Sequence, residues 1–247
     1  MRLLLLDIET SPVSVYTWTL RPKYIDHHWV VKSGSVLCYA AKWHGEGKVH
    51  FRSTQNHSLN YILSDIHKMM CDADAICHYN GSSFDIPVLN TELIKHGFKP
   101  PSPSKQIDLL KVVWKNFRFA SSKLDFVAKQ LGLGEKVRHT GPQLWLDCMA
   151  GDEAAWKKME KYNKMDVELL EKLYDRMKPW IPNHPNVATF DDVKGCPTCG
   201  SEKYEQRGWA FTKMYKYKRF LCKSCGKWFR GSQTVSSRGG EHFTEAV

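Results

Sequence analysis

The sequence lacks any apolar run approaching the ~18–20 residues that a membrane span needs. It also lacks internal repeats and low-complexity tracts, which argues against a repeat protein. Its apolar start, Leu3–Leu6, is interrupted by Asp7 and Glu9 and is too short and wrongly flanked for a signal peptide. Hydrophobic residues make up 42% of the 247 residues, enough to form a core. We therefore expect a soluble, folded protein that is not secreted and does not bind membranes.

A disulfide framework is not expected either, because a chain of this length and apolar content does not need one. Four of the eight cysteines are scattered among apolar neighbours and are expected to act as small buried hydrophobic residues: Cys38, Cys71, Cys77 and Cys148. The other four form two C-x-x-C pairs, Cys196/Cys199 and Cys222/Cys225. Paired C-x-x-C motifs indicate a metal site in a reducing compartment.

Acidic residues are scarce in one part of the chain only. Residues 194–238 carry eleven Lys and Arg against two Glu, a net charge of +9 out of the formal +10 of the whole chain. The first 193 residues carry only +3, and residues 239–247 carry −2. A basic excess is typical of proteins with polyanionic partners. This signal therefore belongs to the C-terminal fifth of the protein.

The order of predicted elements indicates a mixed α/β domain. Apolar segments predict strands over 3–6, 36–43, 48–51, 75–78 and 106–110. Helical spacing predicts helices over 58–70, 84–96, 123–131 and 153–177, the last interrupted near residue 162. The segment around His27 and His28 is expected to be an unstructured insertion. Three prolines after the last helix indicate a stiff linker, which predicts a domain over 1–182, a linker over 183–193, a second module over 194–238 and a flexible tail over 239–247.

Acidic side chains recur where predicted elements begin or end. Asp7 and Glu9 lie at i and i+2 at the end of a buried strand and so share one face, a costly arrangement that a divalent cation would relieve. Asp85 opens a helix after a Gly/Ser loop, where the helix dipole alone would also favour it. Tyr162 and Asp166 share one face of the long helix, at a spacing that is also common for surface pairs. No single one of these features decides the function.

Taken in order, the motifs resemble those of the DEDDy branch of the DnaQ-like 3′→5′ exonucleases, which include the proofreading domains of family B DNA polymerases. The matching segments are Asp7-Ile8-Glu9-Thr10, Asn80-Gly81-Ser82-Ser83-Phe84-Asp85 and Tyr162-Asn163-Lys164-Met165-Asp166, and the stretch from Lys123 to Lys136 also looks similar. The resemblance covers about residues 1–180. It implies a ribonuclease H-like fold, with a mixed sheet flanked by helices.

The resemblance implies that Asp7, Glu9, Asp85 and Asp166 hold two divalent metals, and that Tyr162 orients the attacking water. Two Mg²⁺ or Mn²⁺ ions suit hard carboxylate ligands and would neutralise charge on the phosphate and on the attacking and leaving oxygens. The backbone around Ile8 and Thr10 and the side chain of Asn80 would lie near the scissile nucleotide. Phe84 is expected to be a core residue behind Asp85, and His78 to be a packed strand-end residue.

The four paired cysteines are expected to hold one structural Zn²⁺ in a small β-rich zinc ribbon, although the spacing leaves an iron site of rubredoxin type open. Basic and aromatic residues are interleaved between the two pairs, and their alternation across Lys213–Phe220 predicts that they occupy different strand faces there. Exposed aromatics can stack on bases while Lys and Arg bind phosphate. We expect the ribbon to bind nucleic acid rather than to dock a protein, through Lys213, Lys216, Lys218 and Arg219.

The sequence thus predicts a metal-dependent 3′→5′ exonuclease that acts on DNA ends, preferably single-stranded, with a ribbon that aids substrate binding. The alternatives are a structure-selective nuclease or ribonuclease that uses the same site, and a non-catalytic nucleic-acid-binding adaptor. RNA remains open as a substrate, and a separate polymerase or a replication or repair protein as a partner. The expected location is cytoplasmic or nucleoid-associated, in a bacterial or virus-infected cell.

Overall fold

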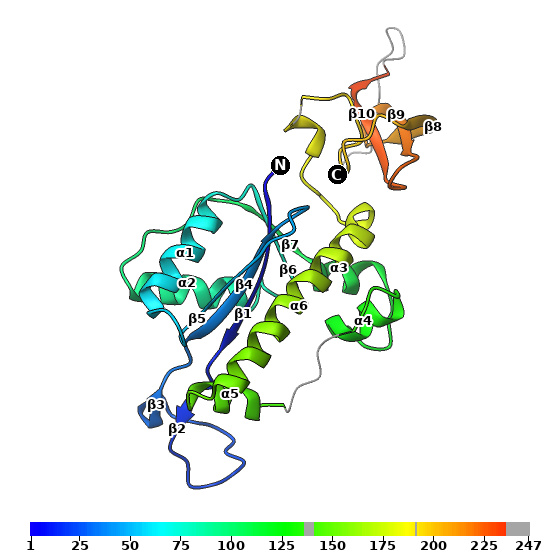
Figure 1. Ribbon diagram of the computed structural model, residues 1–247. Coiled ribbons are helices and arrows are strands. Elements are labelled where there is room, and N and C mark those ends of the chain that lie inside the picture. Colours follow the sequence, from blue (N-terminus) through cyan, green and yellow to red (C-terminus); the bar gives the residue numbers. More distant parts are fainter. Residues whose placement is uncertain (136–140, 191, 236–247) are drawn as a thin grey trace. The chain divides into compact units, whose positions relative to one another are not determined.

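The computed structural model describes residues 1–135, 141–190 and 192–235 (Figure 1). The chain divides into two compact units, one spanning Arg2–Asp175 and the other starting at Arg176. Lys136, residues 236–238 of the predicted ribbon and the predicted tail 239–247 lie outside the described residues. Within the described ranges, no helix is long and apolar enough to cross a membrane.

The first unit is built on a mixed five-stranded sheet in the order β5-β4-β1-β6-β7. The central strand β1 pairs antiparallel with β4 and parallel with β6, β4 pairs antiparallel with β5, and β6 pairs parallel with β7. The strands are β1 (Leu3–Thr10), β4 (Val36–Trp43), β5 (Val49–Ser53), β6 (Ala75–His78) and β7 (Lys105–Asp108). The run Leu3–Leu6 is wholly buried because helices cover both faces of the sheet.

The two faces of the sheet receive different helices (Figure 1). On one face, Leu4, Leu6 and Ile8 of β1 pack in a core with α1 (Leu59–Cys71) and α2 (Asp85–Lys95). The other face packs against α5 (Gln143–Met149) and α6 (Glu153–Met177). Because strand side chains alternate, Asp7 and Glu9 point to the α6 side. The arrangement is that of a ribonuclease H-like fold, as the sequence predicts.

Several predicted elements differ from those observed. The strand expected over 106–110 ends at Asp108, whose carboxylate accepts a hydrogen bond from the backbone N–H of Leu110 (3.1 Å) and caps α3 (Leu109–Asn116). Neither α3 nor α5 is among the expected helices, because each is short and gives little periodic signal. Helix α4 (Leu124–Gln130) lies where a helix is expected. The predicted interruption of α6 is wrong, since this helix runs unbroken for 25 residues.

The segment expected to be an unstructured insertion is also structured. Strands β2 (Ser14–Val15) and β3 (Val30–Lys32) pair antiparallel, and a short 3-10 helix, His27–Trp29, precedes β3. The Asp26 side chain caps this helix by accepting from the backbone N–H of His28 (2.9 Å). The β-branched valines and the Asp cap explain the order, which the polar surroundings conceal in the sequence.

The second unit contains a three-stranded antiparallel sheet in the order β10-β9-β8. Its strands are β8 (Tyr204–Phe211), β9 (Lys216–Cys222) and β10 (Trp228–Thr234). Two 3-10 helices, Lys178–Trp180 and Val187–Thr189, precede it. A β-rich C-terminal region with clustered cysteines therefore accompanies the α/β unit.

Candidate active site and metal centres

Three carboxylates from distant parts of the chain gather at the end of β1. One ligand oxygen from each of Asp7, Glu9 and Asp166 lies within 4.8 Å of the others. Asp7 and Glu9 are half-buried on β1, whereas Asp166 is buried on α6. Like charges held this close repel one another, and divalent cations with oxygen ligands would relieve the repulsion. The geometry therefore fits the predicted metal ligands.

Asp85 is not a member of this compact group. It is buried at the start of α2, and its Oδ1 accepts a hydrogen bond from the backbone N–H of Ile8 (3.0 Å), between the two acidic residues of β1. Burial raises the pKa of the Asp85 carboxyl from 3.8 to about 6, although this hydrogen bond favours the charged form. The fourth predicted carboxylate thus lies next to the cluster and is tied to the same strand.

The structure also places Ile8 and Thr10, whose backbone is predicted to lie near the scissile nucleotide. The backbone N–H of Ile8 is engaged by Asp85, and the Ile8 side chain is buried in the core. Thr10 lies at the end of β1, where a register shift between Glu9 and Thr10 disturbs the pairing with β4. Such irregularities often redirect side chains near functional sites.

Tyr162 lies beside the cluster, on the same face of α6 as Asp166. The two side chains form a hydrogen bond. Burial raises the pKa of the Tyr162 hydroxyl, and the negative charges of Asp166, Glu9 and Asp7 raise it further. The hydroxyl therefore keeps its proton at neutral pH. This suits it to orient a water molecule and not to act as a base.

Two residues that sequence reasoning missed hold the carboxylates of β1. The side-chain Nδ2 of Asn163, which is fully buried on α6, donates to Asp7 Oδ2 (2.6 Å). The indole Nε1 of Trp145 on α5 donates to Glu9 Oε2 (3.0 Å), and its ring meets Tyr162 edge-on with centroids 6.0 Å apart. Asn163 lies inside the Tyr-x-x-x-Asp motif, so its position is a usable signal. Trp145 gives none.

The loop before α2 is held by hydrogen bonds to Asp108. The carboxylate of Asp108 accepts from the backbone N–H groups of Asn80 (2.9 Å) and Ser82 (3.3 Å). Asn80 adopts a left-handed conformation with φ of 70°. A Cβ at Gly81 would lie 2.4 Å from the ring of His78, so only glycine fits there.

His78 is packed at its strand end, as expected, and its Nε2 lies 3.0 Å from Gln106 Oε1. The prediction for Phe84 is wrong, because its side chain is 42% exposed. It occupies the N-cap position of α2, where the chain turns away from the core. Phe84 therefore belongs to the surface near Asp85.

A groove of about 570 Å³ opens beside the cluster. Asp7 and Tyr162 line one part of it, and Asn80 is exposed at its wall. Trp114 of α3 and Lys123 before α4 also line it, and Trp114 is 56% exposed. An aromatic ring and a lysine beside an acidic centre are groups that can contact a base and a phosphate. Trp114 has no signal in the sequence, since α3 is not among the expected helices, whereas Lys123 starts a predicted helix and a segment that resembles the exonucleases.

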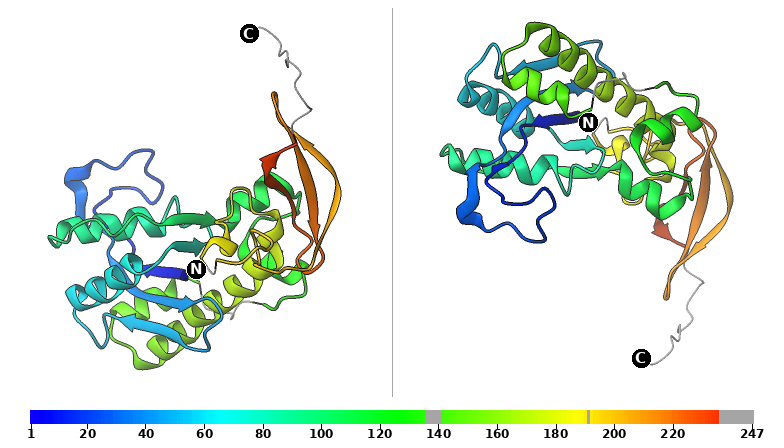
Figure 2. Two further views of the ribbon diagram at one scale, coloured as in Figure 1. Left: turned by 90° about the horizontal axis from the view of Figure 1, so that it is seen from above. Right: turned by 90° about the horizontal axis from the view of Figure 1, so that it is seen from below.

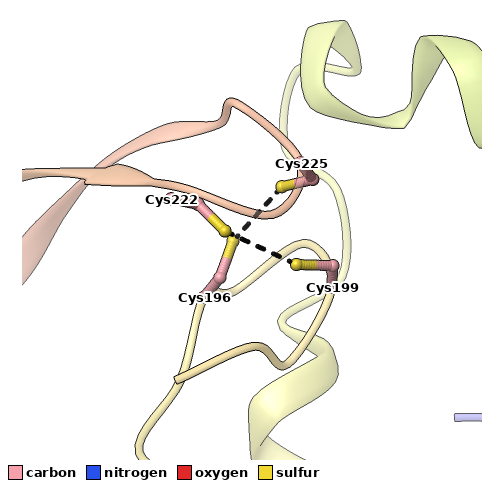
Figure 3. Close-up of side chains that lie close together, drawn as sticks. All are labelled: Cys196, Cys199, Cys222 and Cys225. Atoms are coloured by element: carbon pink, nitrogen blue, oxygen red, sulfur yellow. Dashed lines mark hydrogen bonds between the residues drawn. The ribbon is translucent and has the colours of Figure 1, made fainter. Parts of the chain in front are cut away.

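The second candidate site lies in the second unit, where four cysteine sulfurs converge (Figure 3). The Sγ atoms of Cys196 and Cys225 are 3.7 Å apart, as are those of Cys199 and Cys222. A Zn²⁺ ion with four sulfur ligands at ~2.3 Å in tetrahedral geometry would separate them by about 3.8 Å. The arrangement therefore fits a closed tetrahedral metal site.

The two cysteine pairs form the same turn. The backbone N–H of Gly200 donates to Cys196 O (2.8 Å), and that of Gly226 donates to Cys222 O (3.0 Å). Both glycines have positive φ, 71° and 78°, which a side chain would disfavour. The glycine that follows each C-x-x-C pair thus closes a turn that directs both thiols to one point.

Within β9 the exposed Lys216 and Lys218 alternate with the buried Tyr217, but the neighbouring strands bring further aromatic rings to the cations. Lys216 Nζ lies 4.2 Å from the ring centroid of Trp209, and the Arg219 guanidinium lies 4.9 Å from that of Trp228. The paired residues lie on neighbouring strands, so cross-strand contacts place cation and ring together. Lys213 and Lys218 are exposed. The surface of this sheet is therefore both basic and aromatic.

Comparison with known proteins bears on the first unit. Residues 34–178, more than half of the chain, match the model of the RNase_H superfamily. That range contains Asp85, Tyr162 and Asp166, and it starts after β1. No curated protein matches the chain.

Among solved structures, the chain is similar to a family B DNA polymerase from the hyperthermophilic archaeon Pyrobaculum calidifontis, with a TM-score of 0.56 and 19% sequence identity. The similarity covers 72% of this chain and 24% of the polymerase, and at this identity it is a likeness of fold. The family match, by contrast, rests on the sequence itself. The chain belongs to the RNase_H superfamily.

Proposed function

We propose that the protein is a metal-dependent nuclease that hydrolyses phosphodiester bonds from 3′ ends, preferably in single-stranded DNA. The observation that carries this proposal is the cluster of Asp7, Glu9 and Asp166, with Tyr162 hydrogen-bonded beside it. Membership of the RNase_H superfamily and the resemblance of the three motifs to DEDDy exonucleases support it. Catalysis is assigned to a domain over residues 1–182.

In this proposal, Asp7, Glu9 and Asp166 hold two Mg²⁺ or Mn²⁺ ions together with Asp85. When bound, the ions supply neutralising charge and lower the pKa of an attacking water. Asn163 and Trp145 keep Asp7 and Glu9 in place through the hydrogen bonds described above. Their role is to position ligands, and they do not react.

The protonated hydroxyl of Tyr162 orients the attacking water relative to the phosphate. Trp114, Lys123 and Asn80 line the groove that receives the terminal nucleotide. The ring of Trp114 offers a stacking surface for a base, and Lys123 offers a counter-charge to a phosphate. Ile8 and Thr10 contribute through the shape of the strand end.

The second unit would act as a zinc ribbon over residues 194–238 that holds the nucleic acid. Cys196, Cys199, Cys222 and Cys225 would bind one structural Zn²⁺, as the sulfur spacing supports. Lys213, Lys216, Lys218 and Arg219 would bind phosphates, while neighbouring aromatic rings contact bases. This role explains why the positive charge of the chain is concentrated here.

One experiment separates the proposal from its alternatives. Purified protein is incubated with DNA and RNA oligonucleotides labelled at the 5′ or the 3′ end, over a titration of Mg²⁺ and Mn²⁺. Successive shortening of 5′-labelled single-stranded DNA, with mononucleotide release from the 3′ label, is the expected result. Internal cuts at junctions or preference for RNA would favour the alternative nuclease. Binding without cleavage under every metal condition would identify an adaptor.

A further inference from the structure

The segment between β1 and β4 exposes an unusual amount of apolar surface. Residues 12–33, which we name the β2–β3 extension, contain no buried residue. Trp18 is 93% exposed, Tyr16 is 74% exposed and Tyr24 is 75% exposed. Large apolar side chains that are exposed together in one segment favour an interaction site. The extension is therefore a candidate binding surface.

Backbone hydrogen bonds hold the two ends of the extension together. The backbone N–H of Tyr16 donates to Trp29 O (2.9 Å), which continues the pairing of β2 with β3. At its base, the Ser11 N–H donates to Ser35 O (2.9 Å) and the Ser35 N–H donates to Ser11 Oγ (3.0 Å). These bonds join the two ends of the extension, whereas Trp18 and Tyr24 lie in the segment between them, 16–26, which contains neither helix nor strand.

The charge of the extension favours a polyanion as the partner. Arg21, Lys23 and Lys32 are exposed, whereas Asp26 is its only acidic residue and caps the short 3-10 helix. Basic side chains interleaved with exposed aromatic rings match the requirements of single-stranded nucleic acid, in which phosphates bind cations and bases stack on rings. A purely hydrophobic docking surface would not need the three cations.

The position of the extension connects it with the acidic site. It begins two residues after Thr10, at the end of the strand that carries Asp7 and Glu9. Figures 1 and 2 show it projecting from the sheet at that end of β1. The extension therefore starts at the same end of β1 as the acidic cluster.

We infer that the β2–β3 extension binds the single-stranded part of the substrate upstream of the 3′ end, with Trp18 and Tyr24 stacking on bases and Arg21 and Lys23 contacting phosphates. The inference deepens the proposed function and rests on it, since it names the element that grips the strand outside the acidic site. The extension supplies binding, and the carboxylates supply the chemistry.

The first test measures binding of a fluorescent single-stranded DNA to the full chain without divalent metal, by fluorescence anisotropy. Stacking on one aromatic residue is worth roughly 1–3 kcal/mol, so we expect the W18A/Y24A variant to bind at least about tenfold more weakly. The matched control is Y61A/W180A, which removes one exposed Tyr and one exposed Trp elsewhere and should bind within about twofold of wild type. Equal loss in both variants, or none in either, overturns the inference.

A second variant separates charge from stacking. R21A/K23A removes two phosphate contacts, and the slope of log K against log salt should become shallower by about 1.4, at roughly 0.7 per phosphate for a single strand. W18A/Y24A should leave that slope unchanged. An unchanged slope in R21A/K23A overturns the assignment of these two residues to phosphates.

A third measurement locates the strand directly. A photoreactive base is placed at successive positions from the 3′ end, and crosslinked peptides are identified by mass spectrometry. Crosslinks within residues 16–29 are expected, and their absence from the extension at every position overturns the inference. Sedimentation of wild type and W18A/Y24A tests the other occupant: a dimer that the variant dissociates while DNA binding is unchanged would assign the extension to a second copy of the chain.

These outcomes are independent of the cleavage assay. A wild-type chain that binds and crosslinks through the extension but does not cleave would retain the inference and overturn the nuclease. If the wild-type chain cleaves normally and W18A/Y24A binds DNA like wild type, the nuclease proposal is retained and the inference about the extension is overturned.

Discussion

The two candidate metal sites differ in what they do for the fold. The cysteine site lies in a small β-rich unit, and its ligands lie close together in pairs along the chain. The acidic site lies in a large unit whose core is built by two faces of a sheet and their helices. A metal at the cysteines would therefore hold its unit together, whereas the carboxylates are crowded together at a cost that the core of the first unit must offset.

The largest expected effect is on the second unit. C222S removes one of four sulfur ligands, and because zinc binding in small modules contributes on the order of 10 kcal/mol to folding, the three-stranded sheet should unfold. Limited proteolysis should then cut after residue 190 while residues 1–175 resist. C71S, a half-buried cysteine outside the site, is the control. If the second unit of C222S resists proteolysis as well as that of wild type, a metal at the cysteines does not hold this unit together.

The next largest effect is on activity at the acidic site. D166N keeps the shape of the side chain but removes a negative charge, and loss of one such electrostatic group costs about 10²–10³-fold in kcat. The thermal unfolding of the first unit should be unchanged or raised. Single-turnover cleavage of labelled DNA measures the rate, and zinc content measured on the same sample should equal that of wild type. Cleavage at the wild-type rate would contradict the assignment of Asp166.

The cost of burying a carboxylate next to the cluster can be measured on Asp85. Its pKa in the folded protein, about 6, lies above the ordinary value of 3.8, so the contribution of this group to stability is full below about pH 4 and is lost as the pH rises through 6. D85N cannot ionise, and with Mg²⁺ and Mn²⁺ withheld it should be more stable than wild type at pH 7.5 by on the order of 1–3 kcal/mol. At pH 4 the two should unfold alike. A destabilised D85N at pH 7.5 would show that its hydrogen bond from Ile8 outweighs the burial of its charge.

The smallest effect concerns the residues that hold the carboxylates. W145F removes the indole N–H that donates to Glu9 and keeps an aromatic ring against Tyr162. Loss of such a supporting contact typically weakens metal binding or activity 10–100-fold, and we expect the lower end. The Mn²⁺ concentration for half-maximal cleavage should rise about tenfold. The control is W114F, which changes a Trp in the groove without touching Glu9 and should leave the Mn²⁺ requirement unchanged.

Spacing within single elements is the most informative part of the sequence. Residues at i and i+2 on a strand, and at i and i+4 on a helix, share a face whatever the fold, so the pairs Asp7/Glu9 and Tyr162/Asp166 follow from local spacing alone. The bounds of β4, β6 and α6 are also accessible, because their apolar patterns are long or sharply bounded. The C-x-x-C-G pairs carry their own turn geometry.

Predictions fail where the local pattern is short or ambiguous. Trp145 lies in a seven-residue helix and contacts Glu9 across 136 positions, so nothing near it in the sequence marks it. Phe84 is apolar and precedes a buried Asp, which predicts a core position, yet the turn into α2 leaves it exposed. In the second unit, alternation along one strand does not reveal that cations and rings meet across strands.

The sequence by itself determined which side chains share a face and which cysteines share a turn, since backbone geometry sets both over a few residues. Only the tertiary structure decided that β1 and α6 bring their acidic faces together, that Asp85 reaches the backbone of Ile8, and that the aromatic residues of the segment after β1 are exposed. These depend on burying two faces of one sheet, and the free energy of that burial is a property of the whole unit and not of any segment.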